Sequence, residues 1–328
     1  MNFNHLVKTL AILPTYKCTA ECEGCCYSCS PREQKVLDFS FLEIVIAQAQ
    51  KYFPNYSVNV VTGGECFTLG NRLPELLSLI NSKTTTTRCV SNGFWGKNYK
   101  QASLLFKNLC NNGLTELNIS SGISHNKYVP ISHVINALEI SISNDVSTVL
   151  SIEDDVNDIM LNNFMNNDKI LDLKRSGLKI ITSSWTDKAR KEIKDKYYDI
   201  KGPCRYIYST IGITPYHNIS SCCGLAMENC KYLKLHCNNP DLFDRYINML
   251  CDDIIKIWIY LEGPYSILND VIGEKNIQKF QAKHICELCL AIFNIPELYK
   301  LVKRRAEQKR DRLYRKFIIQ TRRFMHES

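Results

Sequence analysis

Along the first 185 residues, short runs rich in apolar and β-branched residues alternate with longer segments whose apolar residues recur at helical spacing. The short runs predict six strands, at residues 10–15, 57–62, 85–90, 116–120, 147–152 and 178–183. The longer segments predict helices between them, at residues 39–52, 73–82, 99–111, 131–142 and 157–168. Such an alternation is typical of a parallel sheet with crossover helices.

Six strand–helix units are too few to close an eight-stranded barrel, so we expect an α/β fold with an open, partial (β/α)6 barrel. After about residue 200 the alternation stops and cysteines return. We therefore expect two domains: the barrel at residues 1–200, and a cysteine-rich domain at residues 201–328 that ends in a basic helix from Ile295. The apolar stripe predicted along that helix contains Leu298, Leu301, Leu313, Phe317 and Ile318.

Three motifs follow the first three predicted strands. They are a cysteine loop with Cys18, Cys22 and Cys25, the turn Thr62-Gly63-Gly64-Glu65, and the segment Ser91-Asn92-Gly93-Phe94-Trp95-Gly96. In parallel α/β folds the chemistry lies at the carboxyl ends of the strands, because the loops converge there. The three motifs are therefore expected to form one site.

The cysteine loop has the spacing Cys-x3-Cys-x2-Cys, which can present three thiolates on one face. Soft sulfur ligands suit iron, so the three cysteines can bind three irons of a 4Fe-4S cluster and leave the fourth iron open. An open iron can chelate S-adenosylmethionine and transfer an electron to its sulfonium, which releases a 5′-deoxyadenosyl radical. A structural zinc loop is the alternative explanation of these cysteines.

The other two motifs supply groups that can hold S-adenosylmethionine. Gly63 and Gly64 allow close backbone approach to a ligand, and Glu65 can pair with its ammonium group. Ser91 and Asn92 can hydrogen-bond a ribose hydroxyl. Taken alone, the first motif is an ordinary turn and Asn92-Gly93 is a turn signal.

The composition indicates a cellular location and shows where the positive charge of the chain lies. The 328 residues include 16 cysteines, but no apolar run is long enough to cross a membrane and no secretion signal is recognisable, so a cytoplasmic location without disulfides is expected. From Lys300 onward there are eleven Lys and Arg against three Asp and Glu, so the tail alone accounts for the net charge of +8. A solvated basic helix is the favoured interpretation, ahead of a site for an acidic leader peptide, and nucleic acid is a distant third.

The cysteine spacing, the Gly-Gly-Glu turn and the six repeated units resemble the radical S-adenosylmethionine superfamily over about residues 5–190. The residue before the third cluster cysteine is often aromatic in that superfamily and is Gly24 here. Only backbone contacts to the adenine are then expected from this position. Beyond the barrel, a second 4Fe-4S cluster is expected on Cys204, Cys222, Cys286 and Cys289, with Cys230 and Cys237 as competing ligands and structural zinc as the alternative.

The segment from Cys25 to Pro31, the two following motifs, the doublet Cys222-Cys223 and the late pair Cys286/Cys289 further resemble the epipeptide epimerase family over about residues 10–295. The resemblance implies conversion of L-residues to D-residues in a ribosomally made precursor peptide. It also implies that Cys222 ligates the auxiliary cluster and that Cys223 donates a hydrogen atom to the substrate radical. Adjacent residues of an extended backbone point in opposite directions, which is consistent with two such roles. The alternative is that Cys223 is a spare thiol or the true cluster ligand.

One departure from that family affects the substrate. The loop after the fourth predicted strand reads Ser121-Gly122-Ile123-Ser124-His125, where the family has an acidic residue, and only the histidine is retained. Two alternative hypotheses are a maturase that forms thioether or carbon–carbon crosslinks, and a non-catalytic iron–sulfur or zinc scaffold that binds a partner through its basic tail. The expected partners are a precursor peptide and a reductant such as flavodoxin or ferredoxin. No leader-recognition domain is expected before the barrel, because the cysteine loop begins at residue 18.

Overall fold

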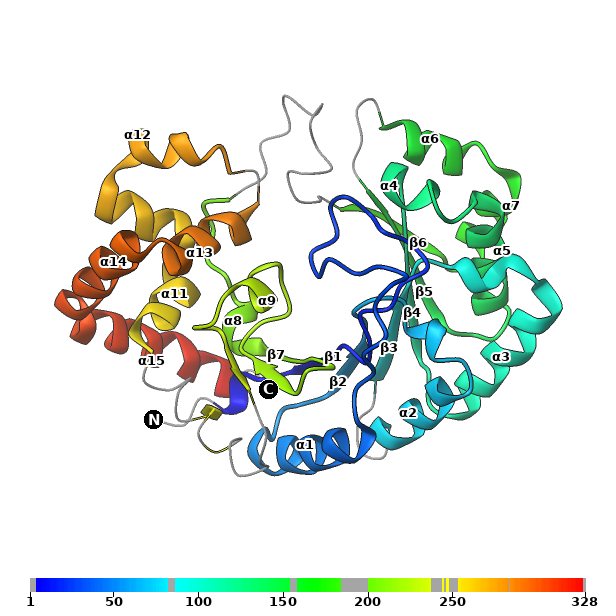
Figure 1. Cartoon of the computed structure of the whole chain (residues 1–328), viewed down its shortest axis with the longest axis horizontal. Helices are drawn as coiled ribbons and strands as arrows, with labels where there is room; N and C mark the ends of the chain where they lie inside the picture. Colours follow the sequence, from blue (N-terminus) through cyan, green and yellow to red (C-terminus); the bar gives the residue numbers. More distant parts are fainter. Residues whose placement is uncertain are drawn as a thin grey trace.

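The computed structural model describes residues 4–81, 86–153, 158–183, 200–236, 244, 246–247, 253–282 and 284–326. This part of the chain forms a nine-stranded sheet with the strand order β6-β5-β4-β3-β2-β1-β7-β8-β9. Figure 1 shows the strands along the inside of a crescent and helices along its outside. In the described ranges, no helix combines the length and the apolar character needed to span a bilayer.

The six predicted strands are all present and form the parallel part of the sheet. Each pairs in parallel with its neighbour in sequence. Their bounds are β1 (Thr9–Ile12), β2 (Val58–Val61), β3 (Thr86–Ser91), β4 (Glu116–Ser121), β5 (Ser147–Glu153) and β6 (Lys179–Ser183). The predicted open α/β barrel is therefore confirmed.

Helices cover the outer face of this sheet, as the alternation predicted (Figure 1). These helices are α1 (Phe39–Tyr52), α2 (Arg72–Ile80), α3 (Tyr99–Asn111), α5 (Ile131–Ile142), α6 (Ile159–Met165) and α7 (Asp168–Arg175). The same part of the chain also has four short helical elements, η1 (Asn4–Leu6), η2 (Cys66–Leu69), η3 (Phe94–Lys97) and α4 (Ile123–Asn126). The helix predicted near 157–168 is present as α6, which ends at Met165, and the helix α7 that follows it was not predicted. Asn167 has an extended backbone and its side chain accepts from the Ile170 N–H at 3.4 Å, so it caps a separate helix, α7.

The sheet continues beyond residue 200, which the sequence pattern did not predict. The strand β7 (Thr210–Ile213) lies parallel to β1, and β8 (Asn218–Ser220) and β9 (Lys234–His236) follow in antiparallel pairing. Strands of three or four residues are too short to show a clear alternation. The cysteine-rich region thus shares its sheet with the barrel, and the domain division at residue 200 stays a prediction.

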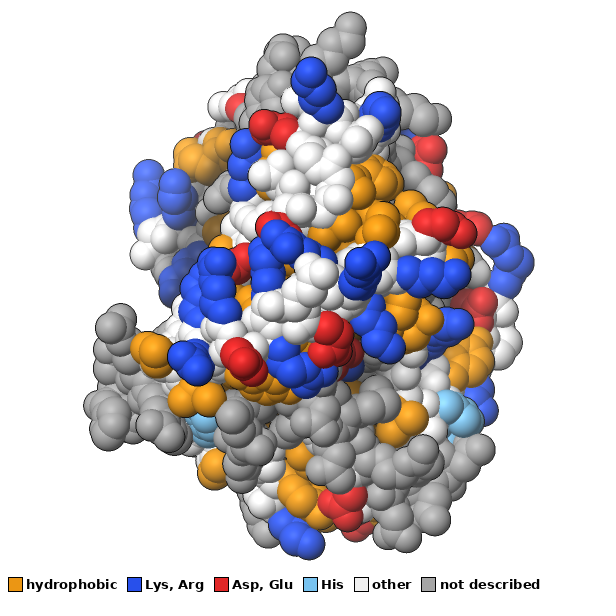
Figure 2. All heavy atoms as spheres, turned by 90° about the vertical axis from the view of Figure 1, so that its left-hand side faces the viewer, with side chains coloured by type: hydrophobic (Ala, Val, Ile, Leu, Met, Phe, Trp, Pro, Cys, Tyr) orange, Lys and Arg blue, Asp and Glu red, His pale blue; other side chains and the backbone are white. Residues whose placement is uncertain are grey.

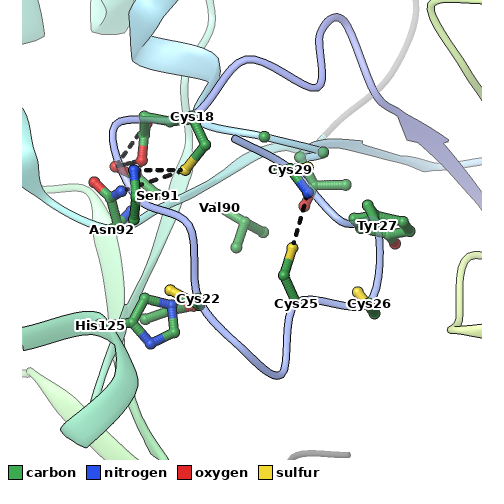
Figure 3. Close-up of a pocket in the computed structure, with 16 residues that line it drawn as sticks. Cys18, Cys22, Cys25, Cys26, Tyr27, Cys29, Val90, Ser91, Asn92 and His125 are labelled. Atoms are coloured by element: carbon green, nitrogen blue, oxygen red, sulfur yellow. Dashed lines mark hydrogen bonds between the residues drawn. The ribbon is translucent and has the colours of Figure 1, made fainter. Parts of the chain in front are cut away.

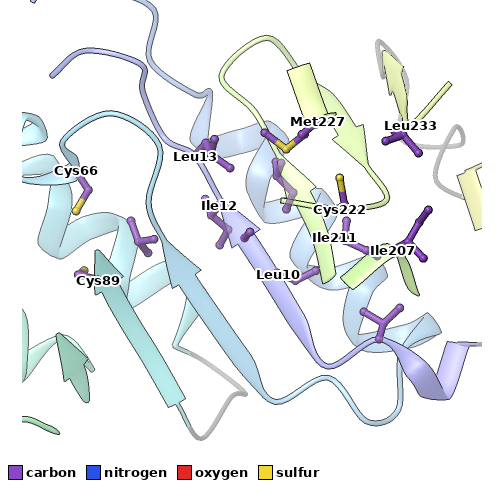
Figure 4. Packing of buried hydrophobic residues seen from close by; sticks show 14 of the residues in the cluster. Leu10, Ile12, Leu13, Cys66, Cys89, Ile207, Ile211, Cys222, Met227 and Leu233 are labelled. Carbon is purple, nitrogen blue, oxygen red and sulfur yellow. The ribbon is translucent and has the colours of Figure 1, made fainter. Parts of the chain in front are cut away.

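The core lies on both sides of β1. Leu10 and Ile12 of β1 are fully buried, and Ile211 of β7 lies beside them (Figure 4). Cys222, which follows β8, belongs to the same buried cluster. Packing against the first strand therefore places the cysteine doublet close to the cysteine loop that β1 delivers.

The C-terminal region is a layer of helices around α11 (Ile254–Ile272), and most side chains of α11 are buried. Gly263 interrupts α11 at a positive φ of 80°, where an added Cβ would lie 1.9 Å from the Gly202 carbonyl oxygen. The other elements here are α8 (Tyr206–Ser209), α9 (Ala226–Asn229), α12 (Glu274–Ile277), η6 (Gln278–Phe280), α13 (Ile285–Asn294), α14 (Pro296–Gln308) and α15 (Arg310–His326).

The prediction of one helix from Ile295 onward is wrong, because the chain breaks at Lys309 into α14 and α15. The break lets two apolar faces pack inward. Leu298 and Val302 of α14 are buried, as are Leu313 and Phe317 of α15. Leu301 was predicted as part of the apolar stripe, but it is 48% exposed and does not belong to the buried face.

Candidate functional site

The loop between β1 and α1 contains the three motif cysteines and lies on the concave side of the sheet (Figure 1). Backbone hydrogen bonds fold the loop back on itself: the Cys18 N–H donates to Ser30 at 3.1 Å, and the Ser30 N–H donates to Tyr16 at 3.3 Å. This pairing holds the cysteines in a fixed turn at the carboxyl end of β1.

A cavity of about 180 Å³ opens beside this loop. Its lining brings together every first-site residue predicted from the sequence, from the loops after β1, β2 and β3 (Figure 3). These residues are Cys18, Cys22, Cys25, Gly63, Gly64, Glu65, Ser91 and Asn92. The expectation that three distant motifs share one place is therefore correct, while their individual roles stay predictions.

The three thiols have unequal environments. Burial, with smaller contributions from the neighbouring cysteines, raises the pKa of Cys22 to about 12, and burial raises the pKa of Cys18 to about 11. Hydrogen bonds from Cys29 lower the pKa of Cys25 to about 6 against the opposing effect of burial. Cys25 is thus already stabilised as a thiolate, while the other two need a cation to compensate for burial.

This donor set fits an iron–sulfur cluster. In the described ranges, no three His, Cys, Asp or Glu side chains converge closely enough to share one metal ion. A cubane cluster distributes its thiolates over separate irons, so ligands spaced around a cavity suit it better than ligands directed at one point. Three thiols around one cavity match that requirement, with room beside them for a ligand of the fourth iron.

The Gly-Gly-Glu turn is fitted to the backbone of the cysteine loop. The Gly64 N–H donates to Thr15 and the Glu65 N–H donates to Lys17, both at 2.8 Å. Gly63 has a φ of 104°, and a Cβ on Gly64 would lie 2.1 Å from the Lys17 carbonyl oxygen. Both glycines are therefore required by the close approach of the two loops.

Glu65 is only 1% exposed, and its carboxylate joins two of the motifs. It accepts hydrogen bonds from the Asn92 N–H at 2.7 Å, from the Ser91 hydroxyl at 3.0 Å and from the Phe67 N–H at 3.1 Å. Burial raises the pKa of Glu65 to about 7, although these hydrogen bonds act in the opposite direction. The carboxylate is thus held in place before any ligand binds.

Ser91 and Asn92 also connect loops. Ser91 Oγ accepts from the Trp95 indole N–H at 3.0 Å, and Asn92 Nδ2 donates to Thr19 Oγ1 at the same distance. The first contact lies within the motif after β3, and the second connects this motif to the cysteine loop. The role of both side chains toward a ribose stays a prediction.

The loop after β4 contributes His125 to the cavity lining, and burial lowers the pKa of this histidine to about 4. The sequence analysis missed the buried carboxylate next to it. Glu153, at the end of β5, accepts from the Ser124 N–H at 2.9 Å and from the Ser124 hydroxyl at 2.6 Å. Gly122 leaves the space for this carboxylate, since a Cβ there would lie 2.2 Å from the Glu153 Cβ. The sequence carries no local signal of this pairing, because the partners lie 29 residues apart.

The second group of cysteines is gathered around α13, which contains Cys286 and Cys289. Burial first, and then the neighbouring thiols of Cys222, Cys286, Cys204 and Cys230, raise the pKa of Cys289 well above its usual value. Gly224 lies directly against this group, because a Cβ there would be 3.1 Å from the Cys286 sulfur. All four predicted ligands are thus neighbours, with Cys230 close by, while the competing Cys237 lies outside the described residues.

Cys222 is buried and the adjacent Cys223 is half-buried. The Tyr27 hydroxyl, from the cysteine loop, donates a hydrogen bond to the Cys223 carbonyl oxygen. Tyr27 lines the cavity, whereas Cys223 is not one of its lining residues and is connected to it through this hydrogen bond. Tyr27, Cys26 and Cys29 were not predicted as site residues. Their proximity in sequence to Cys25 is the signal that could have found them.

No protein-family model matches the chain. Among curated proteins, it is similar to "Putative peptide biosynthesis protein YydG" of Bacillus subtilis (strain 168), with 25% identity over 304 residues that cover 88% of this chain and 93% of the relative. Among solved structures, it is similar to native anSMEcpe with bound AdoMet (TM-score 0.50, 13% identity, 94% of this chain and 99% of that chain).

A second similar structure is native anSMEcpe with bound AdoMet and Cp18Cys peptide, with a TM-score of 0.50 and 13% identity over 94% of this chain and 98% of that chain. All three likenesses extend over nearly the whole chain. The solved structures therefore support the predicted fold, and the curated relative is similar to this chain over most of its length.

Proposed function

We propose that this protein is a radical S-adenosylmethionine enzyme that modifies a ribosomally synthesised precursor peptide and converts L-residues in it to D-residues. The observation that carries the proposal is the single cavity that gathers the cysteine triad, the Gly-Gly-Glu turn and Ser91-Asn92. A peptide substrate is supported by the name of the curated relative and by the peptide bound in the anSMEcpe structure.

In this proposal, Cys18, Cys22 and Cys25 hold a 4Fe-4S cluster, and Glu65 binds the ammonium group of S-adenosylmethionine. When bound, the cluster and S-adenosylmethionine supply a 5′-deoxyadenosyl radical, which takes a hydrogen atom from a substrate Cα. Cys204, Cys222, Cys286 and Cys289 hold a second 4Fe-4S cluster. Cys222 and Cys289 are buried, whereas Cys204 and Cys286 are half-buried.

Cys223 returns the hydrogen atom. The Cys223 S–H bond breaks as a new Cα–H bond forms on the face opposite to the abstraction, so the centre inverts and a thiyl radical is left on Cys223. One electron from a flavodoxin- or ferredoxin-like donor and one proton from solvent restore the thiol. The Tyr27 hydrogen bond holds the Cys223 backbone next to the cavity, where a substrate would bind.

The test is Cys223→Ala in the full chain, assayed with a precursor peptide that the wild-type protein modifies. We expect the variant to keep the iron of both clusters and to release 5′-deoxyadenosine. D-residues should disappear from the product, because the abstracted position has lost its hydrogen source. Chiral amino-acid analysis and mass spectrometry of the product measure this outcome.

Cys222→Ala is the matched control, and it should lose iron from the second cluster. If Cys223→Ala loses that iron instead, the two roles are exchanged. If it makes D-residues in normal yield, the thiol is not the donor. In heavy water, epimerisation adds about one mass unit per site, whereas a crosslink removes two hydrogens. A product that has lost two hydrogens would identify the reaction as crosslinking and not epimerisation.

A further inference from the structure

Three tyrosines form a row from the cavity to the surface, and the proposed function gives two of them no role. The rings of Tyr27 and Tyr16 are stacked, with their centroids 6.1 Å apart and an angle of 8° between their planes. The ring of Tyr216 follows, 5.9 Å from that of Tyr16 and tilted by 48°. Tyr27 lines the cavity (Figure 3), Tyr16 is 6% exposed, and Tyr216 is 43% exposed. The row therefore leads from the cavity through the interior to solvent.

The sheet topology brings the three rings together. Tyr16 and Tyr27 belong to the loop between β1 and α1, whereas Tyr216 belongs to the turn between β7 and β8. Because β7 lies parallel to β1, the loop and the turn leave the same edge of the sheet. Neighbouring aromatic rings are in favourable contact when their centroids are about 4.5–7 Å apart. Electrons pass readily between aromatic rings at such separations, so the row can conduct an electron as well as pack.

The inner end of the row lies against Cys223, because the Tyr27 hydroxyl donates to the Cys223 carbonyl oxygen. In the proposed function, each inversion leaves a thiyl radical on Cys223, and the thiol must be restored before the next substrate is processed. The O–H bond of a phenol and the S–H bond of a thiol are of similar strength. A hydrogen atom can therefore pass from the Tyr27 hydroxyl to the sulfur of the residue that it contacts.

The other two hydroxyls of the row are each hydrogen-bonded to a carboxylate. The Tyr16 hydroxyl donates to Glu228, and the Tyr216 hydroxyl donates to Glu33 at 3.5 Å. A phenol that loses an electron becomes strongly acidic, so it needs a base within hydrogen-bond reach. The two carboxylates can accept the phenolic protons and return them when the rings are reduced again.

We propose that Tyr27, Tyr16 and Tyr216 form a radical-transfer chain that carries one electron from the surface to the Cys223 thiyl radical. The inference rests on the proposed function, because it takes Cys223 as the source of the returned hydrogen atom. The transfer begins when the Tyr27 O–H bond breaks and the Cys223 S–H bond forms. The thiol is then restored, and the unpaired electron lies on Tyr27.

The remaining steps move this radical outward and consume one electron and one proton. Tyr16 gives an electron to Tyr27 and its proton to Glu228, while Tyr27 takes a proton from solvent. Tyr216 then gives an electron to Tyr16 and its proton to Glu33, and Tyr16 recovers its own proton from Glu228. The flavodoxin- or ferredoxin-like donor finally reduces Tyr216, which takes its proton back from Glu33.

The test is continuous turnover of the reconstituted full chain with excess precursor peptide and with flavodoxin as reductant. A small chemical reductant is avoided, because it could reach the thiyl radical directly. Tyr16→Phe and Tyr216→Phe keep an aromatic ring but remove the phenolic O–H. In Tyr16→Phe the Glu228 carboxylate keeps its ion pair with Lys234 at 2.9 Å. Tyr265→Phe is the matched control, because the Tyr265 hydroxyl also donates to a carboxylate, at 2.8 Å, but the ring is not part of the row.

In Tyr16→Phe and Tyr216→Phe, we expect a burst of about one D-residue per chain, followed by D-residue formation roughly tenfold slower than in the wild type. The first turnover needs no restored thiol, so the iron content and the initial release of 5′-deoxyadenosine should match the wild type. Tyr265→Phe should show no burst. Wild-type rates in both variants of the row would overturn the proposal, because the thiyl radical would then be reduced by another route.

Electron paramagnetic resonance separates radical transfer from a structural effect. Tyr216→Phe interrupts the row at its outer end, so samples frozen during turnover should contain a tyrosyl radical on Tyr16 or Tyr27. Ring-deuterated tyrosine should narrow its signal, and the signal should be absent when Tyr16 and Tyr27 are both replaced by phenylalanine. Slow turnover without any tyrosyl radical would overturn the proposal.

The same turnover assay separates this inference from the proposed function. A wild-type protein that forms no D-residues would overturn both. A wild-type protein that forms them at the same rate as Tyr16→Phe and Tyr216→Phe would overturn only the radical-transfer chain.

Discussion

At the scale of single residues, Glu65 shows how the site is prepared for its ligand. Its carboxylate caps η2 by accepting from the Phe67 N–H, and it holds the loop after β3 through Ser91 and Asn92. A buried carboxylate without a cation is costly unless donors surround it. The hydrogen bonds reduce that cost, and a bound ammonium group would remove much of the rest.

We expect Glu65→Ala to weaken S-adenosylmethionine binding without removing either cluster. A hydrogen bond to a charged group contributes about 1.5–3 kcal/mol, so the affinity should fall roughly ten- to a hundred-fold. Calorimetric titration measures the affinity. Glu116→Ala is the control, because Glu116 pairs with Arg88 at the opposite, amino end of the strands. An unchanged affinity in Glu65→Ala would make the turn purely structural.

The raised pKa of Glu65 also predicts a pH dependence. With a pKa of about 7, the carboxyl group is mostly neutral at pH 6 and mostly ionised at pH 8. The cationic ligand prefers the ionised form, so its affinity should increase roughly tenfold over this range. Binding curves at several pH values test this. A Glu65→Gln variant should lose the dependence, and a variant that keeps it would assign the titration to another group.

At the scale of elements, two loops determine each other's shape at the carboxyl edge of the sheet. The turn after β2 donates two backbone hydrogen bonds to the loop after β1, and neither loop can move without breaking them. A backbone contact this close leaves no room for a side chain. The strands place the two loops at the same edge of the sheet, and the glycines allow the loops to approach each other this closely.

Gly64→Ala should therefore displace the cysteine loop. The new Cβ would lie 2.1 Å from the Lys17 carbonyl oxygen, next to Cys18, so we expect loss of iron from the first cluster together with a lower melting temperature. Gly70→Ala is the control, because nothing lies within 4 Å of its Cβ position. Its positive φ of 57° should cost only about 1 kcal/mol. Equal iron in both variants would contradict the close fit.

At the scale of the whole molecule, the sheet brings two cysteine groups from distant parts of the chain to the same side of β1. One precedes α1, and the other is spread over the segment before β7, the segment between β8 and β9, and α13. The Tyr27–Cys223 hydrogen bond connects them. A radical formed at one group and a hydrogen donor at the other would need this proximity.

The basic tail covers one outer face of the molecule, and Figure 2 shows Lys and Arg spread over it with acidic groups among them. Several of these cationic side chains form ion pairs with acidic residues of α11. Arg305 and Lys309 pair with Asp270 at 2.6 and 2.7 Å, and Lys316 pairs with Glu262 at 3.0 Å. The pairs favour the interpretation as a solvated, structural helix pair, and binding of an acidic leader stays a prediction.

Two separate groups of thiols predict two clusters. We expect the anaerobically reconstituted protein to contain about eight irons, since each 4Fe-4S cluster holds four. Replacing Cys18, Cys22 and Cys25 together with alanine should remove about half of that iron and all cleavage of S-adenosylmethionine. Iron analysis and chromatography of 5′-deoxyadenosine check the two outcomes. Cleavage that survives this replacement would place the reactive cluster elsewhere.

The sequence by itself determined the elements whose signals are local. All six parallel strands, and the helices α1, α3 and α5 with their bounds, follow from the alternation of apolar, β-branched runs with segments of helical periodicity. The three motifs after β1, β2 and β3 could be placed together because parallel strands direct their carboxyl ends to one edge. A break such as Lys309, which carries no proline or glycine, could not be predicted in the same way.

Only the tertiary structure decided how distant segments meet. The pairing of β7 with β1, the contact of Glu153 with Ser124, and the hydrogen bond from Tyr27 to Cys223 each join residues far apart in the chain. The hydrogen bond from the Cys29 backbone N–H to the Cys25 sulfur follows one left-handed residue, Ser28, that no periodicity reveals. Such contacts arise from packing between elements, where shape and burial select partners that local propensity does not specify.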